Sequence, residues 1–577
     1  MIVITPVILF LLSIRGAAFM ELDLVIRNGM VVDGTGATRR RADIAMKDGR
    51  IAYIGPIKDS ARASIDADGL IVCPGFVDPH THYDAQISWD PLLNSSSEHG
   101  VTTVVMGNCG VGVAPCRPNH HDRVIEDLIN VEGMSKTVLQ DGIDWQWDTY
   151  SDYLAAAKRK PSALNRAFMV PLSPLRTYVM GDGASERGAT PEETQAIADH
   201  LRAAMESGAS GFSSSNNRSQ IGYQGKPFAA RMTSRDEYAA YCEVLKQAGR
   251  GVIQIAVTNR FATLADDEYE LLDFLLTSSG RNVTWISLLN DAAKPHGCSE
   301  VLEKAAPLLK RGSAPQMLLR PMLREFTLQK PYPFMEIQAA GKVFNQSAQT
   351  QKQIYADPAF RAALKGELAE GRRFTGQPPK TIVCKVGNPA LRGHETRTVG
   401  EIAAARNADA LDTLLDIALE DNLETLFAYE RGNSDRGQIA DMLRDPRTMI
   451  GLSDGGAHVD MLYEAGYPTY LLSHWVREQQ VLTLERAVQR ITSEPADFFG
   501  LRGRGRLAAG EAADIVMFDE ATIGSAERGA FIYDLPTGAG RLHAGAQGIA
   551  RVIVNGKTLY QDGKPTGDRV GDVISSS

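Results

Sequence analysis

Short apolar runs alternate with longer amphipathic stretches over most of this 577-residue chain, and this alternation limits the fold more than any other feature. The apolar runs have the length of buried strands, and the amphipathic stretches have the spacing of helices that cover a sheet. Such strand–helix units build a parallel sheet, so we predict the α/β fold class. The amphipathic stretches include 192–207, 234–249, 398–406 and 408–421. The candidate strands are 73–79, 102–107, 167–172, 208–213, 251–257, 282–289, 316–322 and 449–453.

Eight strands with intervening helices predict a (β/α)8 barrel of the TIM type, which uses about 250 to 400 residues as one unit. We assign residues 73–500 to this barrel. The gap between the seventh and eighth strands is too long for one helix, so we expect an insertion near 325–440, as a lid or as extra helices. The seventh strand has a competitor in the run TIVCKV at 381–386.

The two ends of the chain share a different pattern. Residues 20–72 and 501–577 contain short alternating or apolar runs separated by NG and DG turn signals, which is typical of antiparallel strands. We therefore expect a small β-sandwich domain built from both termini and flanking the barrel. The central segment and the two ends together account for the chain from residue 20 onward.

Residues 1–19 are treated separately. Positions 2–12 are mostly apolar, but eleven residues are too few for a membrane-spanning helix, which needs about 20. The segment is expected to be either a start-site artefact or a secretory leader, although no Lys or Arg precedes Arg15. The expected location is the cytoplasm, or a secreted or periplasmic one if residues 1–19 are a signal peptide. No stable membrane span is expected.

The charge and the cysteine content bear on partners. A net charge of −9 gives no electrostatic reason to bind nucleic acid. Six cysteines in a chain of this length are too sparse for a disulfide framework. The expected partner is a small-molecule substrate, and self-association into a homo-oligomer is left open.

Residues with metal-binding chemistry follow three of the candidate strands. In such barrels the chemistry lies at the carboxyl ends of the strands. His80 and His82 follow the first strand, and residues i and i+2 of an extended segment point the same way. Cys109 follows the second strand and Asp454 the eighth. A single Cys is usually a small buried apolar residue and a single Asp usually a turn former, so the argument depends on the four together.

Several motifs carry a resemblance to a known family. The run GLIVCPGFVDPHTHYD resembles the opening motif of the metal-dependent amidohydrolase superfamily, and VTTVVMGNCGVGVAP resembles its N-acyl-D-amino-acid deacylase (D-aminoacylase) branch. The resemblance extends over about 22–565. It implies a distorted TIM barrel, a small β-sandwich and hydrolysis of an amide by a zinc-activated water. Further motifs that resemble the branch are PLRTYVMG, SDGGAH, WVRE, TSEPADFFGL and LAAGEAADIVMFD.

The resemblance also implies roles for particular residues. His80, His82, Cys109 and Asp454 match the family's first metal site. The histidines of a second zinc site fall near Thr258 and Leu288, and a substrate-binding Lys falls near Asn290. Thr is a poor zinc ligand and Leu is none, so the second site looks lost and about one zinc per chain is expected. No Lys lies near the fourth strand, which disfavours a carbamylated-lysine dinuclear centre.

Catalytic and substrate-binding roles follow from this ligand set. Asp454 is the expected general base, taking the proton of the water and passing it to the leaving amine. His458 is expected to orient the oxyanion or the surroundings of the metal, unless it is structural. A deacylase for acyl amino acids needs a cation for the α-carboxylate, and the candidates are Arg477, Arg320 and Arg260. Each could instead form a surface or packing salt bridge.

Two functions from different classes are consistent with these residues. The first is a metal-dependent amidase for N-acyl amino acids, preferably D-amino acids, or related amides. The second is a protein that keeps the amidohydrolase fold and serves binding or assembly with little or no hydrolase activity. The intact four-ligand set favours the amidase, because a protein that does no catalysis has no need of it.

Overall fold

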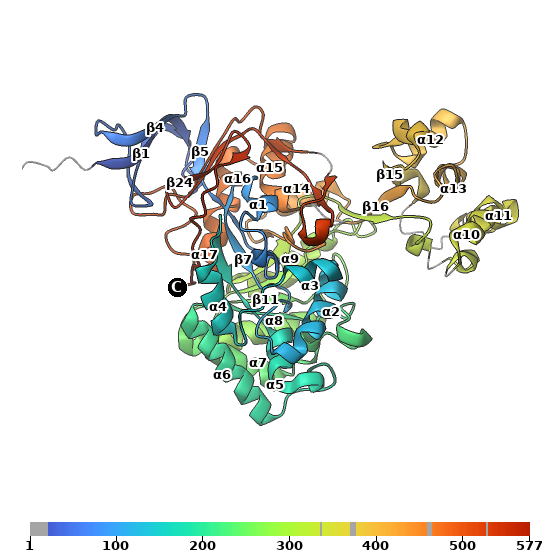
Figure 1. Ribbon diagram of the computed structural model, residues 1–577, viewed down its shortest axis with the longest axis horizontal. Helices are drawn as coiled ribbons and strands as arrows, with labels where there is room; N and C mark the ends of the chain where they lie inside the picture. The colour runs from blue at the N-terminus through green and yellow to red at the C-terminus, as the bar shows by residue number, and fades with distance from the viewer. Residues whose placement is uncertain (1–20, 335–336, 345, 370–376, 459–463, 527–528) are drawn as a thin grey trace, which may run out of the picture.

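The computed structural model describes residues 21–334, 337–344, 346–369, 377–458, 464–526 and 529–577 (Figure 1). The expectation about residues 1–19 lies outside the described residues. Among the helices of these described segments, none is both long enough and apolar enough to cross a membrane. The helices are α1 (Asn94–Ser97), α2 (His121–Glu132), α3 (Lys136–Gly142), α4 (Tyr150–Arg159), α5 (Leu172–Met180), α6 (Pro191–Ser207), α7 (Arg235–Ala248), α8 (Asp266–Ser279), α9 (Gly297–Leu309), α10 (Ala348–Ala356), α11 (Pro358–Ala369), α12 (Val399–Arg406), α13 (Ala410–Glu420), α14 (Arg436–Arg444), α15 (Tyr467–Tyr470), α16 (Leu484–Arg490) and α17 (Ser493–Phe499).

Parallel strands run through the centre of the molecule in two connected sheets. One sheet has the order β6-β7-β8 and the other the order β17-β13-β12-β11-β10-β9, and β8 and β9 are separated only by Met169. Every pairing in these sheets is parallel. These strands are β6 (Phe76–Asp78), β7 (Val101–Met106), β8 (Asn165–Phe168), β9 (Val170–Pro171), β10 (Gly211–Ser215), β11 (Val252–Ala256), β12 (Val283–Ile286), β13 (Ser313–Met317) and β17 (Met449–Ile450).

The helices between the strands pack around them, as Figure 1 shows for α4 to α8. Their starts are specified locally. At α6 the side chain of Thr190 accepts from the backbone N–H of Glu193, and Glu193 accepts from the N–H of Thr190 in return. Ser234 and Glu237 form the same reciprocal cap at α7. Such capping boxes satisfy backbone donors that a helix start leaves unpaired.

The seventh strand differs from the prediction in position. It runs over Ser313–Met317, three residues before the predicted 316–322. The apolar run that drew the prediction continues past the strand, and its Leu318 packs with Leu289 and Leu452 in a separate small cluster. The competing run at 381–386 forms β15 (Ile382–Lys385), which belongs to a different sheet.

Both ends of the chain join one nine-stranded sheet. Its order is β25-β24-β23-β18-β5-β1-β2-β3, with β4 pairing to β1. Strand β18 lies antiparallel between β5 and β23, so a late strand separates an early strand from another late one. The sheet has its own apolar cluster, which includes Ile26, Ile44 and Ile515. Its strands are β1 (Leu22–Val31), β2 (Arg40–Lys47), β3 (Arg50–Ile54), β4 (Ala61–Asp66), β5 (Ile71–Pro74), β18 (Ile515–Phe518), β23 (Ile549–Val554), β24 (Lys557–Gln561) and β25 (Lys564–Pro565).

The segment between the seventh and eighth parallel strands contains a small unit with its own core. Strands β14 (Met322–Phe326), β15 and β16 (Leu426–Gly432) form an antiparallel sheet of order β14-β16-β15. Helices α10 to α13 cover it, and Phe326, Leu414 and Phe427 are among its buried residues. In Figure 1 this unit projects from the side of the parallel sheets. Two short hairpin-like pairs complete the strands: β19 (Gly524–Ser525) with β22 (Ala546–Gln547), and β20 (Ala530–Ile532) with β21 (Arg541–His543).

Candidate metal centre

Two histidines leave the first parallel strand side by side. β6 ends at Asp78, and His80 and His82 follow with almost no exposed surface. The chain stays extended there, because Thr81 bridges to Gly455 and the N–H of His82 donates to the carbonyl of Gly455 at 2.7 Å. The loop after the first strand is thereby tied to the loop after the eighth.

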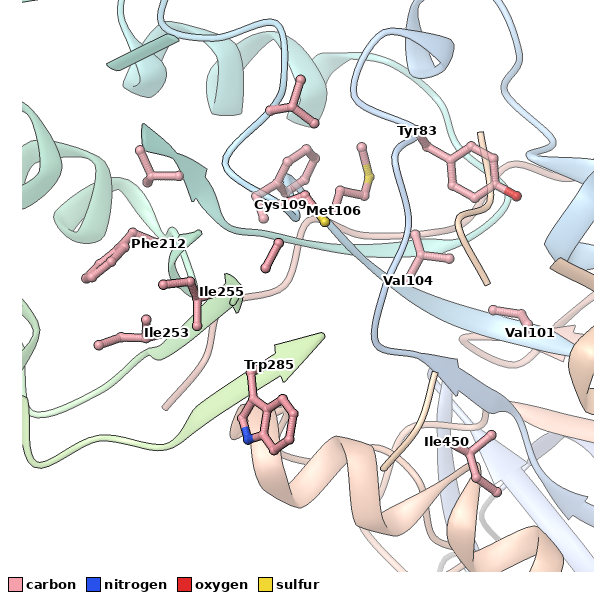
Figure 2. Packing of buried hydrophobic residues seen from close by; sticks show 14 of the residues in the cluster. Tyr83, Val101, Val104, Met106, Cys109, Phe212, Ile253, Ile255, Trp285 and Ile450 are labelled. Atoms are coloured by element: carbon pink, nitrogen blue, oxygen red, sulfur yellow. The ribbon is translucent and has the colours of Figure 1, made fainter. Parts of the chain in front are cut away.

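A tight turn delivers the cysteine. Cys109 has a φ of +55°, a left-handed conformation uncommon for a side-chain-bearing residue. Gly107, just before it, is needed because a Cβ there would lie 2.1 Å from the carbonyl oxygen of Met169. The N–H of Cys109 donates to Gln254 Oε1 at 2.6 Å, which holds the turn against β11. Figure 2 shows Cys109 next to Met106, among the apolar side chains of the same buried cluster.

The predicted ligands converge on one point. One ligand atom each from His80, His82 and Cys109 lies within 4.8 Å of the others. His80 Nε2 is 3.3 Å from Cys109 Sγ and 3.4 Å from Asp454 Oδ1. His82 Nε2 is 3.7 Å from the same Asp454 oxygen. Four residues that lie far apart in the sequence, from His80 to Asp454, therefore come close together in the folded chain.

The cluster fits a zinc ion in chemistry, and the distances from its two histidines to Cys109 and Asp454 fit in size. Two imidazoles, a thiolate and a carboxylate are all zinc ligands. Ligand bonds of about 2.0 to 2.3 Å in a tetrahedron imply separations of about 3.3 to 3.8 Å between ligand atoms. The three distances above lie in that range. The side chains are also prepared for a cation, since burial lowers the pKa of His80 to about 4 and so keeps its imidazole neutral.

Burial disfavours the charged forms of the two acidic candidate ligands. Burial raises the pKa of the Cys109 thiol well above its usual value, and the nearby acids Glu132 and Asp454 add to that shift. Burial, followed by the charge of Glu464, raises the pKa of Asp454 to about 7. A bound cation reverses this effect, because it stabilises the thiolate and the carboxylate directly. The site is therefore poorly suited to stand without a positive ion.

The family comparison agrees with this geometry. The sequence matches the family model described as "Amidohydrolase family" over residues 63–560. This chain belongs to the amidohydrolase family. It is therefore a metal-dependent hydrolase of carbon–nitrogen bonds.

Individual relatives resemble this amidohydrolase over nearly its whole length. D-aminoacylase of Alcaligenes xylosoxydans xylosoxydans is 30% identical over 559 residues, covering 96% of this chain and 97% of the relative. N-acyl-D-glutamate deacylase of the same organism is 28% identical over 555 residues, covering 95% of each. One similar solved structure is N-acyl-D-glutamate deacylase from Bordetella bronchiseptica, complexed with zinc and a phosphonate mimic of the tetrahedral intermediate. It gives a TM-score of 0.63 at 25% identity and covers 96% of this chain and 99% of its own. An L-hydantoinase from Arthrobacter aurescens, 15% identical with a TM-score of 0.50 over 95% of this chain and 98% of its own, shares the fold alone.

One solved D-aminoacylase structure is described for a binuclear metal centre with one-metal activation and second-metal attenuation. It has a TM-score of 0.64 and 25% identity to this chain, covering 96% of this chain and all of that one. In this amidohydrolase, Thr258 Oγ1 donates to the carbonyl of Ser287 at 3.1 Å and accepts from its N–H at 2.8 Å. Leu288 is buried. Within the described segments, the His80, His82 and Cys109 group is the one cluster of three or more potential ligands.

Asn290 has a structural role where the resemblance places a substrate-binding Lys. Its Nδ2 donates to Asn433 Oδ1 at 2.9 Å, and its Oδ1 accepts from the N–H of Asp435 at 2.9 Å. Asn433 in turn donates to the carbonyls of Leu318 and Arg320. Asn290 thus holds the point at which the chain returns from the β14–β16 unit to the parallel strands.

The candidate arginines lie in different surroundings. Arg320 follows β13, is 6% exposed, stacks 4.0 Å from the ring centre of Tyr470 and donates to Ser525 Oγ at 2.6 Å. Its charge opposes the rise that burial causes in the pKa of Glu464, and Glu464 lines one pocket together with Asp454. Arg477 instead donates to the carbonyls of Ile523 and Glu520, at 2.6 and 3.3 Å. The third candidate, Arg260, is exposed.

Polar neighbours that the sequence analysis did not single out hold the histidines. His80 Nδ1 lies 2.9 Å from Gln316 Oε1, and Gln316 Nε2 donates to Thr284 Oγ1 at 3.0 Å. His82 Nδ1 faces Glu132 Oε1 at 3.7 Å. Gln316 is a buried polar residue in a strand, and such a residue is a signal that could have identified it. No local feature of the sequence around Glu132 indicates that its side chain faces His82.

Proposed function

We propose that this amidohydrolase removes the acyl group from N-acyl-D-amino acids. The observation that carries the proposal is the convergence of His80, His82, Cys109 and Asp454 at the carboxyl ends of parallel strands. The relatives named D-aminoacylase and N-acyl-D-glutamate deacylase match nearly the full chain, which supports a shared reaction class. The amide bond of an acyl amino acid is the proposed scissile bond.

The proposal includes an architecture. The strands from β6 to β17 form a TIM-type barrel, closed where Thr81 bridges to Gly455. Residues 20–72 and 501–577 form a small β-sandwich domain, which the sheet shared by both termini supports. The barrel domain takes residues 73–500, and the expected insertion near 325–440 contains the β14–β16 unit.

His80, His82, Cys109 and Asp454 would hold one zinc ion. Zinc bound there supplies a Lewis acid that polarises the amide carbonyl and lowers the pKa of a water molecule. Asp454 is the residue that moves protons: its carboxylate takes the proton of the attacking water and delivers it to the nitrogen of the leaving amine.

Substrate recognition is assigned to Arg320 and His458. Arg320 is buried against Tyr470, and a guanidinium presents two parallel donors to an α-carboxylate. The side chain of His458 is 26% exposed and follows Asp454 by four residues, so it can reach an acyl oxygen. Arg477 is the weaker candidate for the carboxylate, because its guanidinium is engaged with the backbone of the 520–523 segment.

A hydrolysis screen tests the proposed function. The zinc-loaded protein is expected to release free amino acid from N-acetyl-D-amino acids faster than from their L counterparts, measured by amine detection or chromatography. Because the metal is essential in this proposal, chelator-treated protein is the control and should release none. Zinc-loaded protein that hydrolyses neither enantiomer of any N-acyl amino acid would contradict the proposal.

The metal content is expected to be about one tightly bound zinc per chain. Thr258 and Leu288 stand where the resemblance places histidine ligands of a second zinc. Leu288 has no ligand atom, and the hydroxyl of Thr258 is already hydrogen-bonded to Ser287. Elemental analysis of protein expressed with zinc and then dialysed checks this number. Two tightly held zinc ions, or none, would show that the ligand set is wrong.

A further inference from the structure

A buried glutamate lies between a proposed zinc ligand and the loop after the eighth strand. Glu132 is the last residue of α2 and is 3% exposed. Its Oε1 faces His82 Nδ1 at 3.7 Å, and its Oε2 faces His458 Nε2 at 3.7 Å. The backbone joins the same residues, because the N–H of His458 donates to the carbonyl of Glu132 at 2.7 Å. One carboxylate therefore faces two imidazoles from two different strand ends.

The position is unfavourable for an acid on local grounds. The C-terminal end of a helix is the negative end of its dipole, so a cationic residue is preferred in the last turn. Burial, together with the neighbouring acids Asp454 and Asp84, also raises the pKa of Glu132 well above its usual value. Within the described segments, His82 Nδ1, the imidazole atom that faces Glu132, is buried without a hydrogen-bond partner. Residues that break local rules in this way are expected at functional sites.

Glu132 faces Nδ1 of His82 in the same way that Gln316 faces Nδ1 of His80. Both histidines turn Nε2 toward Cys109 or Asp454, and both turn Nδ1 toward a side-chain oxygen. A hydrogen bond from Nδ1–H to such an oxygen leaves the lone pair on Nε2, which is the atom available to a metal. The separation of 3.7 Å is about 0.5 Å beyond the ordinary limit of a hydrogen bond, a gap that a small side-chain rotation closes.

We propose that Glu132 is a positioning residue that sets the tautomer and orientation of His82 for zinc and joins His458 to the same carboxylate. The inference rests on the proposed zinc site. His82 donates Nδ1–H to one oxygen of Glu132, and His458 donates Nε2–H to the other. A residue that faces the substrate side is thereby coupled, through one buried side chain, to a residue that holds the metal.

The test compares zinc affinity in Glu132→Gln and in the parent, by competition with a chromophoric chelator. Removing an outer carboxylate partner of a zinc-bound histidine weakens metal binding by about 10- to 100-fold, and we expect a loss in that range. The cobalt-loaded variant should also show a changed visible spectrum, because His82 is no longer held in one orientation. Metal-free Glu132→Gln should unfold at a temperature no lower than that of the metal-free parent, since burial of the acid is unfavourable there.

Asp127→Asn is the matched control. Asp127 is a buried acid on the same helix, and it accepts from the N–H of Tyr223 at 2.7 Å. Its substitution should leave zinc affinity and the cobalt spectrum unchanged while lowering stability. If Glu132→Gln does not fold, Glu132→Asp replaces it. Its carboxylate is one methylene shorter, so it stays acidic but moves away from both imidazoles. Glu132→Asp should also weaken zinc binding.

The outcomes separate this inference from the proposed function. A parent that binds no zinc contradicts the metal site itself, and the assignment of Glu132 with it. A parent that binds zinc, with a folded Glu132 variant of equal affinity and unchanged cobalt spectrum, contradicts the positioning role alone. An equal loss of affinity in Asp127→Asn would also overturn the role, because it would show a general effect of removing acids from α2.

Discussion

His80→Ala is expected to abolish zinc binding and hydrolysis together while the chain still folds. His80 Nε2 lies between Cys109 Sγ and Asp454 Oδ1, at 3.3 and 3.4 Å, so its removal takes away the ligand nearest to two others. The fold should persist, because the surrounding strands have their own apolar core and the ion is proposed to be catalytic. Zinc content by elemental analysis, amide hydrolysis and far-ultraviolet circular dichroism measure the three properties.

The matched control for this substitution is His296→Ala. His296 is exposed at the start of α9 and lies outside the cluster, so zinc content and activity should equal those of the parent. A folded His80→Ala variant that keeps one zinc and substantial activity would show that the ion is held elsewhere. An unfolded variant would instead show that the zinc site is part of what stabilises the fold.

Asp454→Asn is expected to keep its zinc and lose about 10²- to 10⁴-fold in hydrolytic rate, the usual contribution of general acid–base catalysis. The amide oxygen can still face the metal, and His80, His82 and Cys109 remain, but an amide cannot accept the proton of the water. Asp454→Ala should lose more, because it also loosens the metal. The measurements are zinc content and the steady-state rate with the best substrate found in the screen.

Asp236→Asn provides the control for a lost carboxylate, since Asp236 is exposed in the first turn of α7 and should have no effect on rate. Zinc-replete Asp454→Asn with nearly full activity would remove Asp454 from the role of base. The role would then pass to His458, which follows it by four residues and faces Glu132. A variant that loses zinc as well as activity would mean that binding and proton transfer by Asp454 are inseparable.

Local patterns were sufficient for the parallel strands and the four clustered side chains. Strand and helix periodicities depend on neighbours along the chain, so they identified segments that overlap all of the parallel strands. The prediction that His80 and His82 point the same way needed only the two-residue repeat of an extended segment. Cys109 and Asp454 could be joined to them because parallel strands end at a common edge, and this rule does not depend on details of packing.

The seventh strand shows where local patterns were insufficient. Its observed segment, Ser313–Met317, begins with the polar Ser313 and contains Pro315, and neither residue fits the apolar run that predicts a buried strand. The more apolar residues that follow, such as Leu318, pack outside the strand. The missed start of the strand and the apolar run after it thus moved the predicted strand by three positions.

Contacts between distant segments were decided by packing alone. Glu132 lies 50 positions after His82 and 326 before His458, and no periodicity relates a helix end to two strand ends so far away. The choice between Arg320 and Arg477 was equally open, because both are arginines that follow parallel strands in the sequence. Only the folded chain shows that Arg477 is engaged with the carbonyls of Glu520 and Ile523. A side chain's chemistry is specified by its own residue, but the groups it faces depend on how helices and strands pack, which is a property of the whole core.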